Sequence, residues 1–316
     1  MPQETSKLPA RVILIAGPTA SGKSELAALL GERLGAEVVG ADSRQVYRRL
    51  DVGTAKPSAE LRRRTRHHLI DTVDVDEPYD VSTWRRDALA AIADIEARGR
   101  RVIVCGGTGL YLRSLTRGLF AGPAADPVLR ERLAAEERRR PGALHTGLVR
   151  IDPAAAARIH PNDMVRLVRA HEVYELTGRP LSAWHREHGL ADRPFAALVL
   201  EPAVSREELW RRIEERSKAI AAAGIVEELA ALRGRYPSDL KPFDAIGYRE
   251  AGKCLDGLLA LELLAPAISK STRAYAKRQA VWLRGQLETV PVGGAAAALA
   301  AAESFFDRVA KRQGIG

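Results

Sequence analysis

Apolar runs and amphipathic segments alternate through the first third of the chain. Short apolar runs that predict buried strands lie near residues 11–16, 37–40, 68–70 and 101–104. Helical periodicity covers residues 23–34 and 82–98, and the second of these segments opens with Ser82 as a cap and closes at Gly99. Strands that alternate with helices in this way predict a parallel sheet with helices on both faces.

The pattern changes at the sequence Ala-Gly-Pro-Ala-Ala near residues 121–125. From there it is helical, without a convincing strand, until an apolar run at 195–201. Asp152-Pro153 predicts a helix start because proline suits the first helical position after a cap. A further helix is expected from Asn162 or Asp163 to about Leu176, before Gly178.

The last third is mostly helical in pattern, with Ser205 as a cap and an alanine-rich closing helix around residues 295–302. We therefore predict an α/β fold in which helices flank a parallel sheet and a helical insertion interrupts the chain. The core is expected in residues 1–122 and 192–316, and the all-helical insertion domain in residues 123–191.

Composition agrees with a globular protein that has a large core. The chain has 316 residues, of which 46% are hydrophobic and 28% are charged, and no apolar run approaches the length of a membrane span. Residues 1–9 lack the basic start and apolar segment of a signal peptide, so we expect a cytoplasmic protein. Cys105 and Cys254 match no metal or redox spacing and are interpreted as reduced structural residues.

The formal net charge of +9 suggests a polyanionic partner. Residues 270–284 hold five basic side chains and no acidic one. On a helix, Lys270, Arg273, Lys277 and Arg284 share one face, while Tyr275, Gln279 and Trp282 form a second stripe. The aromatic stripe favours packing in the core, and the basic face is the better candidate for contact with a nucleic-acid backbone.

One motif carries chemistry by itself. A strand-forming run precedes a glycine-bounded loop and a helix start, which is the context of a phosphate-binding loop (P-loop). The backbone N–H groups of such a loop bind phosphate oxygens, Lys23 reaches the outer phosphate and the Ser24 hydroxyl can hold Mg²⁺. The pattern leaves open whether the ligand is a nucleoside triphosphate or another diphosphate ester. The loop residues are Gly17, Pro18, Thr19, Ala20, Ser21, Gly22, Lys23 and Ser24.

Two other strand ends carry candidate polar groups. Asp42 follows a strand expected beside the one that leads into the P-loop, so its carboxylate could abstract a proton or contact a metal. The alternative is that Asp42 or Ser43 caps the next helix. Thr108, after Gly106-Gly107, can donate a hydrogen bond to a ligand or, alternatively, cap a helix that begins at Gly109.

Basic side chains in two further places have competing interpretations. Arg166 and Arg169 share a helix face and could grip RNA or a diphosphate, although a solvated face is the alternative. The pair His67-His68 follows the arginine-rich stretch 62–66. It lacks the spacing of a metal site, and we expect it on a solvated face.

Taken together, these residues resemble the bacterial tRNA dimethylallyltransferases, which prenylate an adenosine in the anticodon loop. The resemblance covers nearly the whole chain in the family order, and the combination is far more specific than the P-loop alone. The matching strings are GPTASGKS (17–24), ADSRQVYRRLDVGTAKPS (41–58), HHLID (67–71), GGTGLYL (106–112), DPAAAARIHPND (152–163), RLVRA (166–170), IGYRE (246–250) and YAKRQAVWLR (275–284).

The resemblance implies that the P-loop holds the diphosphate of dimethylallyl diphosphate, with Mg²⁺ as cofactor. The diphosphate leaves as the prenyl group moves to the exocyclic amine of the adenosine 3′ of the anticodon. Arg212 and Arg216 would complete the diphosphate site. Asp42 matches the general base, which an adenine amine needs because its lone pair is delocalised into the ring. Thr108 matches a position that contacts the target nucleotide.

The resemblance also assigns contacts with tRNA. The helical insertion would clamp the anticodon stem-loop, whose target base is flipped into a channel. At 281–283 the sequence is Val-Trp-Leu, where the family more often has Thr-Trp-Phe. This difference concerns local packing or a base contact and does not change the functional class that the resemblance implies. The implied tRNA contacts are Asp42, Ser43, Arg44, Gln45, Thr108, Arg130, Val165, Arg166, Leu167, Val168, Arg169, Gly247, Tyr248, Arg249, Lys277, Arg278, Gln279, Trp282 and Arg284.

Two other functions use the same features. A small-molecule kinase would bind ATP with this loop, and an RNA-binding nucleotide switch would combine the loop with the basic insertion without chemistry. The end of the strand at 101–104 carries no acidic second magnesium ligand, which argues against an ATP-driven motor. No strong apolar helical stripe marks a partner surface, so a monomer is expected.

Overall fold

The computed structural model describes residues 10–120, 122–188 and 194–311. The chain divides into two compact units, Met1–Thr116 with Arg193–Gly316, and Arg117–Asp192. The second unit begins earlier than the expected residue 123 because Phe120 packs against Trp184 and His185 of that unit. The expected boundary at residue 192, the residues 1–9 examined for a signal peptide, and Ala121 lie outside the described residues.

A six-stranded sheet forms the centre of the first unit, and every pair of neighbouring strands is parallel. The strand order is β3-β2-β4-β1-β5-β6. The strands are β1 (Ala10–Ala16), β2 (Ala36–Gly40), β3 (His67–His68), β4 (Arg101–Gly106), β5 (Phe195–Pro202) and β6 (Val290–Val292). The P-loop follows the inner strand β1, so the sheet confirms the predicted α/β class.

Two strands differ from the prediction. The run expected at 68–70 pairs only through His67 and His68, because the positive φ of 59° at Leu69 turns the chain out of the strand. His67 and His68 are therefore half-buried residues of an edge strand, and the solvated face expected for them is wrong. Strand β6 was not predicted, since three residues are too few for a periodic signal.

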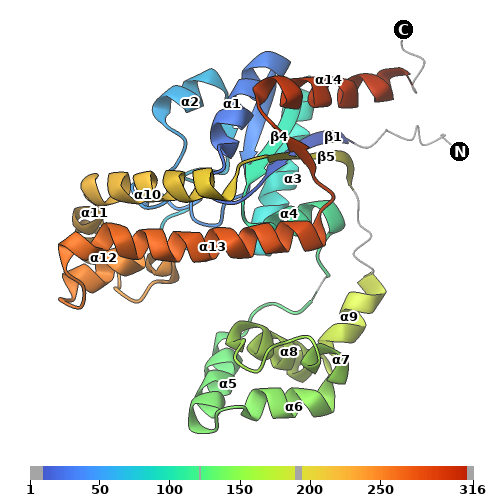
Figure 1. Cartoon of the computed structure of the whole chain (residues 1–316). Helices are drawn as coiled ribbons and strands as arrows, with labels where there is room; N and C mark the ends of the chain where they lie inside the picture. The colour runs from blue at the N-terminus through green and yellow to red at the C-terminus, as the bar shows by residue number, and fades with distance from the viewer. Residues whose placement is uncertain (1–9, 121, 189–193, 312–316) are drawn as a thin grey trace, which may run out of the picture. The chain divides into compact units, whose positions relative to one another are not determined.

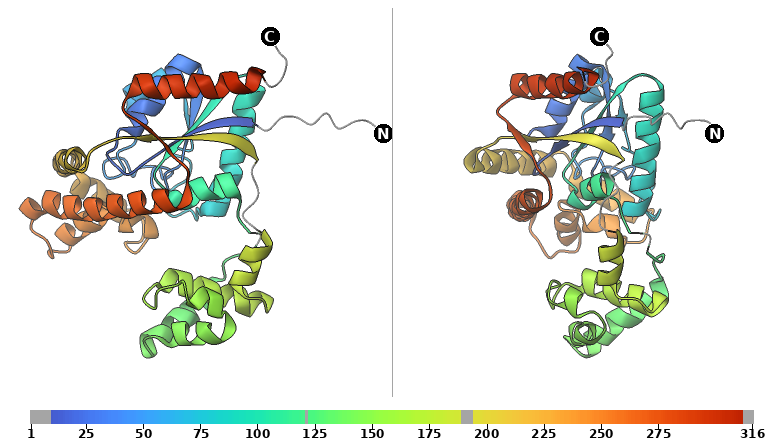
Figure 2. Two further views of the ribbon diagram at one scale, coloured as in Figure 1. Left: turned by 45° about the vertical axis from the view of Figure 1, so that its right-hand side comes forward. Right: turned by 90° about the vertical axis from the view of Figure 1, so that its right-hand side faces the viewer.

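Alternate residues of β1 point into two separate cores. Val12 and Leu14 pack with Trp84 on one face of the sheet, whereas Ile13 and Ile15 pack with helices α1 and α14 on the other. A strand that is buried on both faces needs an uninterrupted apolar sequence, which explains the run before the P-loop. In the right-hand view of Figure 2, α3 and α14 lie on opposite sides of the strands.

The helices of the first unit complete both layers. Their bounds are α1 (Lys23–Leu34), α2 (Ala59–Arg64), α3 (Val81–Ala97), α4 (Gly109–Arg117), α10 (Arg206–Ala222), α11 (Ile225–Arg233), η1 (Lys241–Asp244), α12 (Tyr248–Leu255), η2 (Leu261–Leu263), α13 (Leu264–Gln286) and α14 (Ala295–Lys311). Helices α10 and α13 pack against each other (Figure 1). None of the helices in the described residues is long and apolar enough to cross a membrane.

Helix starts follow local capping chemistry. Ser205 caps α10 as predicted, by accepting a hydrogen bond from the Glu208 N–H. The cap of α3 is Asp80 and not the predicted Ser82, because the Asp80 carboxylate accepts from the N–H groups of Ser82 and Thr83 at 2.9 Å. An acidic side chain at this end also interacts favourably with the helix dipole.

The second unit is entirely helical in its described residues. Its helices are α5 (Pro127–Arg139), α6 (Ala143–Ile151), α7 (Pro153–Ala156), α8 (Met164–Thr177) and α9 (Leu181–His188). The predicted starts at Asp152-Pro153 and Asp163 are both capped by the aspartate side chain. Leu133, Leu148 and Leu167 are fully buried in the core of this unit.

Candidate active site

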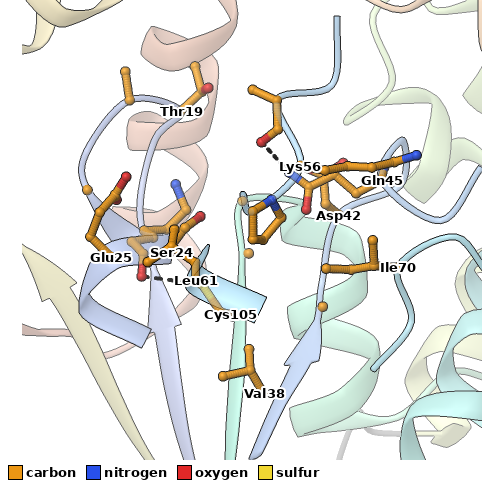
Figure 3. A pocket seen from close by; sticks show the side chains of 18 of the residues that line it. Thr19, Ser24, Glu25, Val38, Asp42, Gln45, Lys56, Leu61, Ile70 and Cys105 are labelled. Carbon is orange, nitrogen blue, oxygen red and sulfur yellow. Dashed lines mark hydrogen bonds between the residues drawn. The ribbon is translucent and has the colours of Figure 1, made fainter. Parts of the chain in front are cut away.

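A cavity of about 780 Å³ opens at the carboxyl ends of β1, β2 and β4. In open parallel sheets, ligands bind at this edge. The P-loop and the start of α1 form one side of the cavity, and Asp42, Gln45 and Ile70 lie on the other (Figure 3). Val38 lies between the two sides (Figure 3). The cavity therefore joins three strand ends that the sequence presented separately.

The P-loop presents an uncapped helix N-terminus to the cavity. Gly22 is the N-cap of α1 and has a φ of 88°, a left-handed conformation that glycine adopts without a steric penalty. Gly22 has no side chain that could accept a hydrogen bond from the first N–H groups of the helix, so these donors remain available to a ligand. Thr19, Ala20, Gly22, Lys23 and Ser24 line the cavity, whereas Ser21 is buried behind the loop.

Lys23 carries a positive charge with little solvation. Its Nζ donates to the Pro18 carbonyl at 2.5 Å, which folds the side chain back over its own loop. Burial of the ammonium group, together with the nearby Arg216, lowers its pKa to about 8 despite the opposing effect of Cys105. An anion bound in the loop would restore the interactions that Lys23 loses by burial.

Two arginines of α10 add to this positive side of the cavity. The Arg212 Nη1 lies 3.5 Å from the position that a Cβ on Gly22 would occupy, so its guanidinium borders the P-loop. Arg212 is held there by Glu208, whose carboxylate accepts from its Nε at 2.6 Å. Burial lowers the pKa of Arg216, although Asp42 and Glu25 oppose the shift. Both arginines line the cavity, and their role in a diphosphate site stays a prediction.

Ser24 is the one candidate metal ligand of the P-loop. Among the residues that the structure describes, its hydroxyl has no hydrogen-bonding partner, and no cluster of three His, Cys, Asp or Glu could hold a metal by itself. Mg²⁺ commonly uses one or two protein ligands together with waters and substrate phosphates. The donor set at the P-loop therefore fits Mg²⁺ bound with a diphosphate, and does not fit an all-protein metal site.

Asp42 organises a turn at the end of β2. Its Oδ1 accepts from the N–H groups of Arg44 at 2.8 Å and Gln45 at 3.3 Å. No helix follows, so the alternative of a helix cap is wrong in detail, although the carboxylate does stabilise the local chain. Asp42 also lines the cavity. One carboxylate oxygen thus holds the turn, and the side chain as a whole is accessible from the ligand space.

Thr108 fastens that turn to the neighbouring loop. Its Oγ1 accepts from the Ser43 N–H at 3.1 Å, and its own N–H donates to the Ala41 carbonyl at 3.2 Å. Thr108 also stands at the N-cap position of α4, since its carbonyl accepts from the Leu112 N–H at 3.2 Å, although its side chain bonds to the Ser43 N–H. The two loops approach so closely that a Cβ on Gly106 would lie 2.1 Å from the Ala41 oxygen. Thr108 positions the Asp42 turn from behind.

The remaining predicted residues of this turn serve local structure as well. The Gln45 amide donates to the Thr54 and Ala55 carbonyls, both at 3.2 Å, and the side chain lines the cavity. Arg44 donates to the Lys241 carbonyl at 3.2 Å. These bonds hold both side chains, of which that of Gln45 lines the cavity, without assigning either a contact with tRNA.

Some predicted tRNA contacts lie inside the protein. Tyr248 is fully buried, and its hydroxyl donates to Glu228 and accepts from the Gly53 N–H, so its side chain is not available to RNA. Leu167 is likewise fully buried in the core of the second unit, and Val168 packs against that core. The side chains of Tyr248 and Leu167 therefore offer no surface to tRNA, because burial depends on elements far away in the chain, and the contact that the resemblance implies at these positions stays a prediction.

Gln279 is also mostly enclosed, with 8% of its surface exposed. Its amide oxygen accepts from the Thr19 N–H at 2.9 Å and its amide nitrogen donates to the Gly107 carbonyl at 2.8 Å. Trp282 packs so closely on the start of α4 that a Cβ on Gly109 would lie 2.5 Å from the indole ring. This stripe of α13 therefore packs on the loops of the site, in agreement with the core interpretation of the aromatic positions.

The exposed basic residues of α13 are Lys270, Lys277, Arg278 and Arg284. Arg273, expected on the same basic face, is paired with Glu214 of α10 at 3.2 Å. On α12, Gly247 is the N-cap with a φ of 97°, and Arg249 is held by Glu250 and Ser271.

Three arginines of the second unit that were predicted to contact tRNA are tied to carboxylates. Arg130 and Arg169 both donate to Glu172, a fully buried residue, at 2.7 and 2.5 Å. Burial raises the pKa of Glu172, but the bonds from the two arginines outweigh it and hold the pKa at about 2. Arg166 donates to the Asp163 carboxylate at 2.7 Å. Val165 is 82% exposed and remains available at this surface.

An apolar part of the cavity was not anticipated from the sequence. Val38, Pro57, Leu61 and Ile70 line it, from β2, the segment before α2, α2 itself and the turn after β3. Nearby, the Lys56 ammonium is paired with Asp71 at 2.5 Å and Asp51 at 2.6 Å, which fixes the segment that carries Pro57. These residues come from separate elements, so no local pattern could have grouped them.

Comparisons with known proteins agree with this arrangement. The model of the IPP transferase family matches residues 45–286. A tRNA dimethylallyltransferase of Geobacter metallireducens is 50% identical over 283 residues, which cover 89% of this chain and 91% of that protein.

Two solved structures share the fold. A tRNA isopentenylpyrophosphate transferase from Bacillus halodurans is 32% identical with a TM-score of 0.72, and the match covers 96% of this chain and 99% of that one. A eukaryotic dimethylallyltransferase acting on tRNA is 29% identical with a TM-score of 0.74, covering 90% of this chain and 74% of that one. With the family model spanning most of its length, this chain belongs to the IPP transferase family.

Proposed function

We propose that this protein transfers a dimethylallyl group from dimethylallyl diphosphate to the exocyclic amine of the adenosine 3′ of the anticodon in tRNA. The observation that carries the proposal is that the P-loop and Asp42 line one cavity, with an anion site on one side and a carboxylate on the other. Relatives named tRNA dimethylallyltransferase support the choice of reaction. We also propose that the protein acts in the cytoplasm, where tRNA is modified, and that it acts as a monomer.

The diphosphate binds in the P-loop. The first N–H groups of α1, Lys23 and the two arginines of α10 supply positive charge where negative charge develops on the leaving diphosphate. Donors that are held in place before the reaction stabilise such charge without a cost of reorganisation. Ser24, together with the diphosphate, would hold Mg²⁺, which would supply additional Lewis-acid stabilisation of the leaving group.

The dimethylallyl group occupies the apolar part of the cavity. Val38, Leu61 and Ile70 offer aliphatic side chains to a short branched hydrocarbon, and Pro57 adds a rigid edge. Burial of this group excludes water from the allylic carbon, which protects the donor from hydrolysis.

Asp42 accepts the proton of the adenine amine as the C–N bond forms. The amine is a weak nucleophile, so removal of a proton during bond formation lowers the barrier. The hydrogen bonds from Arg44 and Gln45 to Oδ1 hold the carboxylate in one orientation. The exposed cations Lys277, Arg278 and Arg284 bind the RNA backbone, and the second unit clamps the anticodon stem-loop.

The test is mass spectrometry of an unmodified anticodon stem-loop RNA after incubation with the protein, Mg²⁺ and dimethylallyl diphosphate. We expect one dimethylallyl group on the adenosine 3′ of the anticodon. Asp42→Asn keeps an oxygen for the turn but removes the base, so it should lower kcat by about 10²- to 10⁴-fold with RNA affinity nearly unchanged.

The same experiment separates the alternatives. Unchanged turnover of Asp42→Asn would reduce Asp42 to its role in the turn. No product from the unaltered protein, with an active relative as positive control, would contradict the proposal. Consumption of ATP with a phosphorylated product would then indicate a kinase, and nucleotide-dependent RNA binding without a covalent product would indicate a switch.

A further inference from the structure

Gln279 connects the two loops of the site from a third element. Its amide oxygen accepts from the Thr19 N–H in the P-loop, and its amide nitrogen donates to the Gly107 carbonyl in the loop after β4. A Cβ on Gly107 would lie 2.3 Å from the Gln279 nitrogen, so the approach requires glycine there. One side chain of α13 therefore links the strand ends of β1 and β4.

The link continues to Asp42. The next residue after Gly107 is Thr108, which accepts from the Ser43 N–H and donates to the Ala41 carbonyl. These two bonds hold the turn that carries Asp42. Hydrogen bonds, together with the peptide bond between Gly107 and Thr108, thus connect the P-loop through Gln279 to the turn that carries Asp42.

We infer that Gln279 is a positioning residue that fixes the separation between the diphosphate in the P-loop and the base Asp42. This inference rests on the proposed function. The allylic carbon must lie between the departing oxygen and the incoming amine, so the rate depends on the distance between the two sides of the cavity. A displacement of about 1 Å from a reactive geometry can lower a rate by about 10²-fold.

The chemistry of the position favours an amide. It needs one acceptor for the Thr19 N–H and one donor for the Gly107 carbonyl, and an amide supplies both in a single plane. An ionised carboxylate has no donor and would face the Gly107 oxygen with a negative charge. A protonated carboxyl group has the shape of the amide and restores both bonds, with its carbonyl as acceptor and its hydroxyl as donor.

The experiment therefore compares Gln279→Glu and Gln279→Met with the unaltered protein between about pH 5.5 and 8. Gln279→Met keeps the volume and removes both bonds, so its kcat should be about 10- to 100-fold lower at every pH, with the KM of both substrates changed less than about threefold. Gln279→Glu should be as impaired as Gln279→Met at high pH and should recover as the pH falls.

Several charged or titratable groups line the same cavity and are present in both the unaltered protein and the variant. Tyr275 lies on the same helix, with a pKa that burial and Asp42 raise to about 12, and Lys23, Asp42, Arg212 and Arg216 line the same cavity. Their own effects on turnover are common to the unaltered protein and the variant. The quantity to plot is therefore the ratio of the two kcat values against pH.

Gln286 provides the control, because it lies on the same helix, is only partly buried and has no hydrogen bond to a described residue of the site. Gln286→Glu should give a ratio that does not vary with pH. A ratio for Gln279→Glu that does not vary with pH would overturn the inference. So would a Gln279→Met variant whose lower activity is fully explained by the fraction of protein that is unfolded at the assay temperature. Failure of the proposed function is distinguishable, because the unaltered protein would then form no prenylated RNA.

Discussion

Lys23 illustrates how one side chain couples ligand binding to pH. Its pKa is lowered to about 8, mainly by burial, whereas an anion beside it stabilises the protonated form. Between about pH 8 and the usual lysine pKa near 10.4, Lys23 of the free protein is mostly neutral, so the protein must take up a proton to bind a diphosphate. The unfolded chain also binds more protons in this window, so the contribution of Lys23 to stability rises with pH while its contribution to binding falls.

We expect the affinity for dimethylallyl diphosphate to be nearly constant below about pH 8 and to fall by up to about tenfold per pH unit above it. Isothermal titration calorimetry in two buffers of different ionisation enthalpy would detect the proton that is taken up. Lys23→Arg retains the charge throughout this range, so its affinity should be lower but independent of pH. An identical pH profile for both proteins would show that Lys23 is not the titrating group.

At the scale of elements, the site depends on how closely the ends of β2 and β4 approach each other. Gly106 ends β4, and the Ala41 carbonyl next to it accepts from the Thr108 N–H. The nearest neighbour of Gly106 is backbone, so no rotamer change can make room for a side chain there. A glycine at this position therefore allows the contact between the two loops.

Gly106→Ala should lower the free energy of unfolding by about 1–3 kcal/mol, because the strand ends must separate. Turnover should fall as well, since the Asp42 turn moves with Ala41. Urea unfolding followed by circular dichroism measures the first effect. Gly285→Ala is the control, because nothing lies within 4 Å of a Cβ at that position of α13, and it should leave stability unchanged or slightly raised. Equal stabilities of the two variants would contradict this account of the contact.

At the scale of the whole molecule, the chain builds two units with separate cores. The second unit is stabilised by its leucine cluster and by Glu172, which is fully buried beneath Arg130 and Arg169. The pKa of Glu172 is held at about 2, so its ion pairs stabilise the unit above about pH 4.5 and are lost as the pH falls from there to 2. The arginines are partly exposed, which reduces the effect by solvent screening.

Glu172→Gln should destabilise the second unit by about 1–2 kcal/mol, because two guanidiniums lose a buried charged partner. Hydrogen exchange read by mass spectrometry should show faster exchange in α5 and α8 and unchanged exchange in β1 and β4. Glu131→Gln breaks the exposed pair with Arg138 and should change neither region. Faster exchange throughout the first unit would contradict the separation of the two cores.

The sequence alone was sufficient where the signal is local. The apolar run, the two glycines and Lys23-Ser24 specify a strand, a loop and a helix start within fifteen residues, and capping residues such as Asp152 and Ser205 marked helix starts correctly. These features depend on backbone groups only a few positions apart, so the chain itself determines them.

Tertiary structure decided everything that depends on which elements meet. Leu167, Tyr248 and Gln279 stand in strings that suggested an RNA surface, yet their neighbours in space make the first two core residues and the third a link between loops. The apolar part of the cavity likewise joins residues from four separate segments. The order of residues therefore determined the phosphate-binding loop and the class of fold, whereas burial and the shape of the cavity arose only when distant segments packed together, because solvent exclusion is a property of the packed elements and not of any one of them.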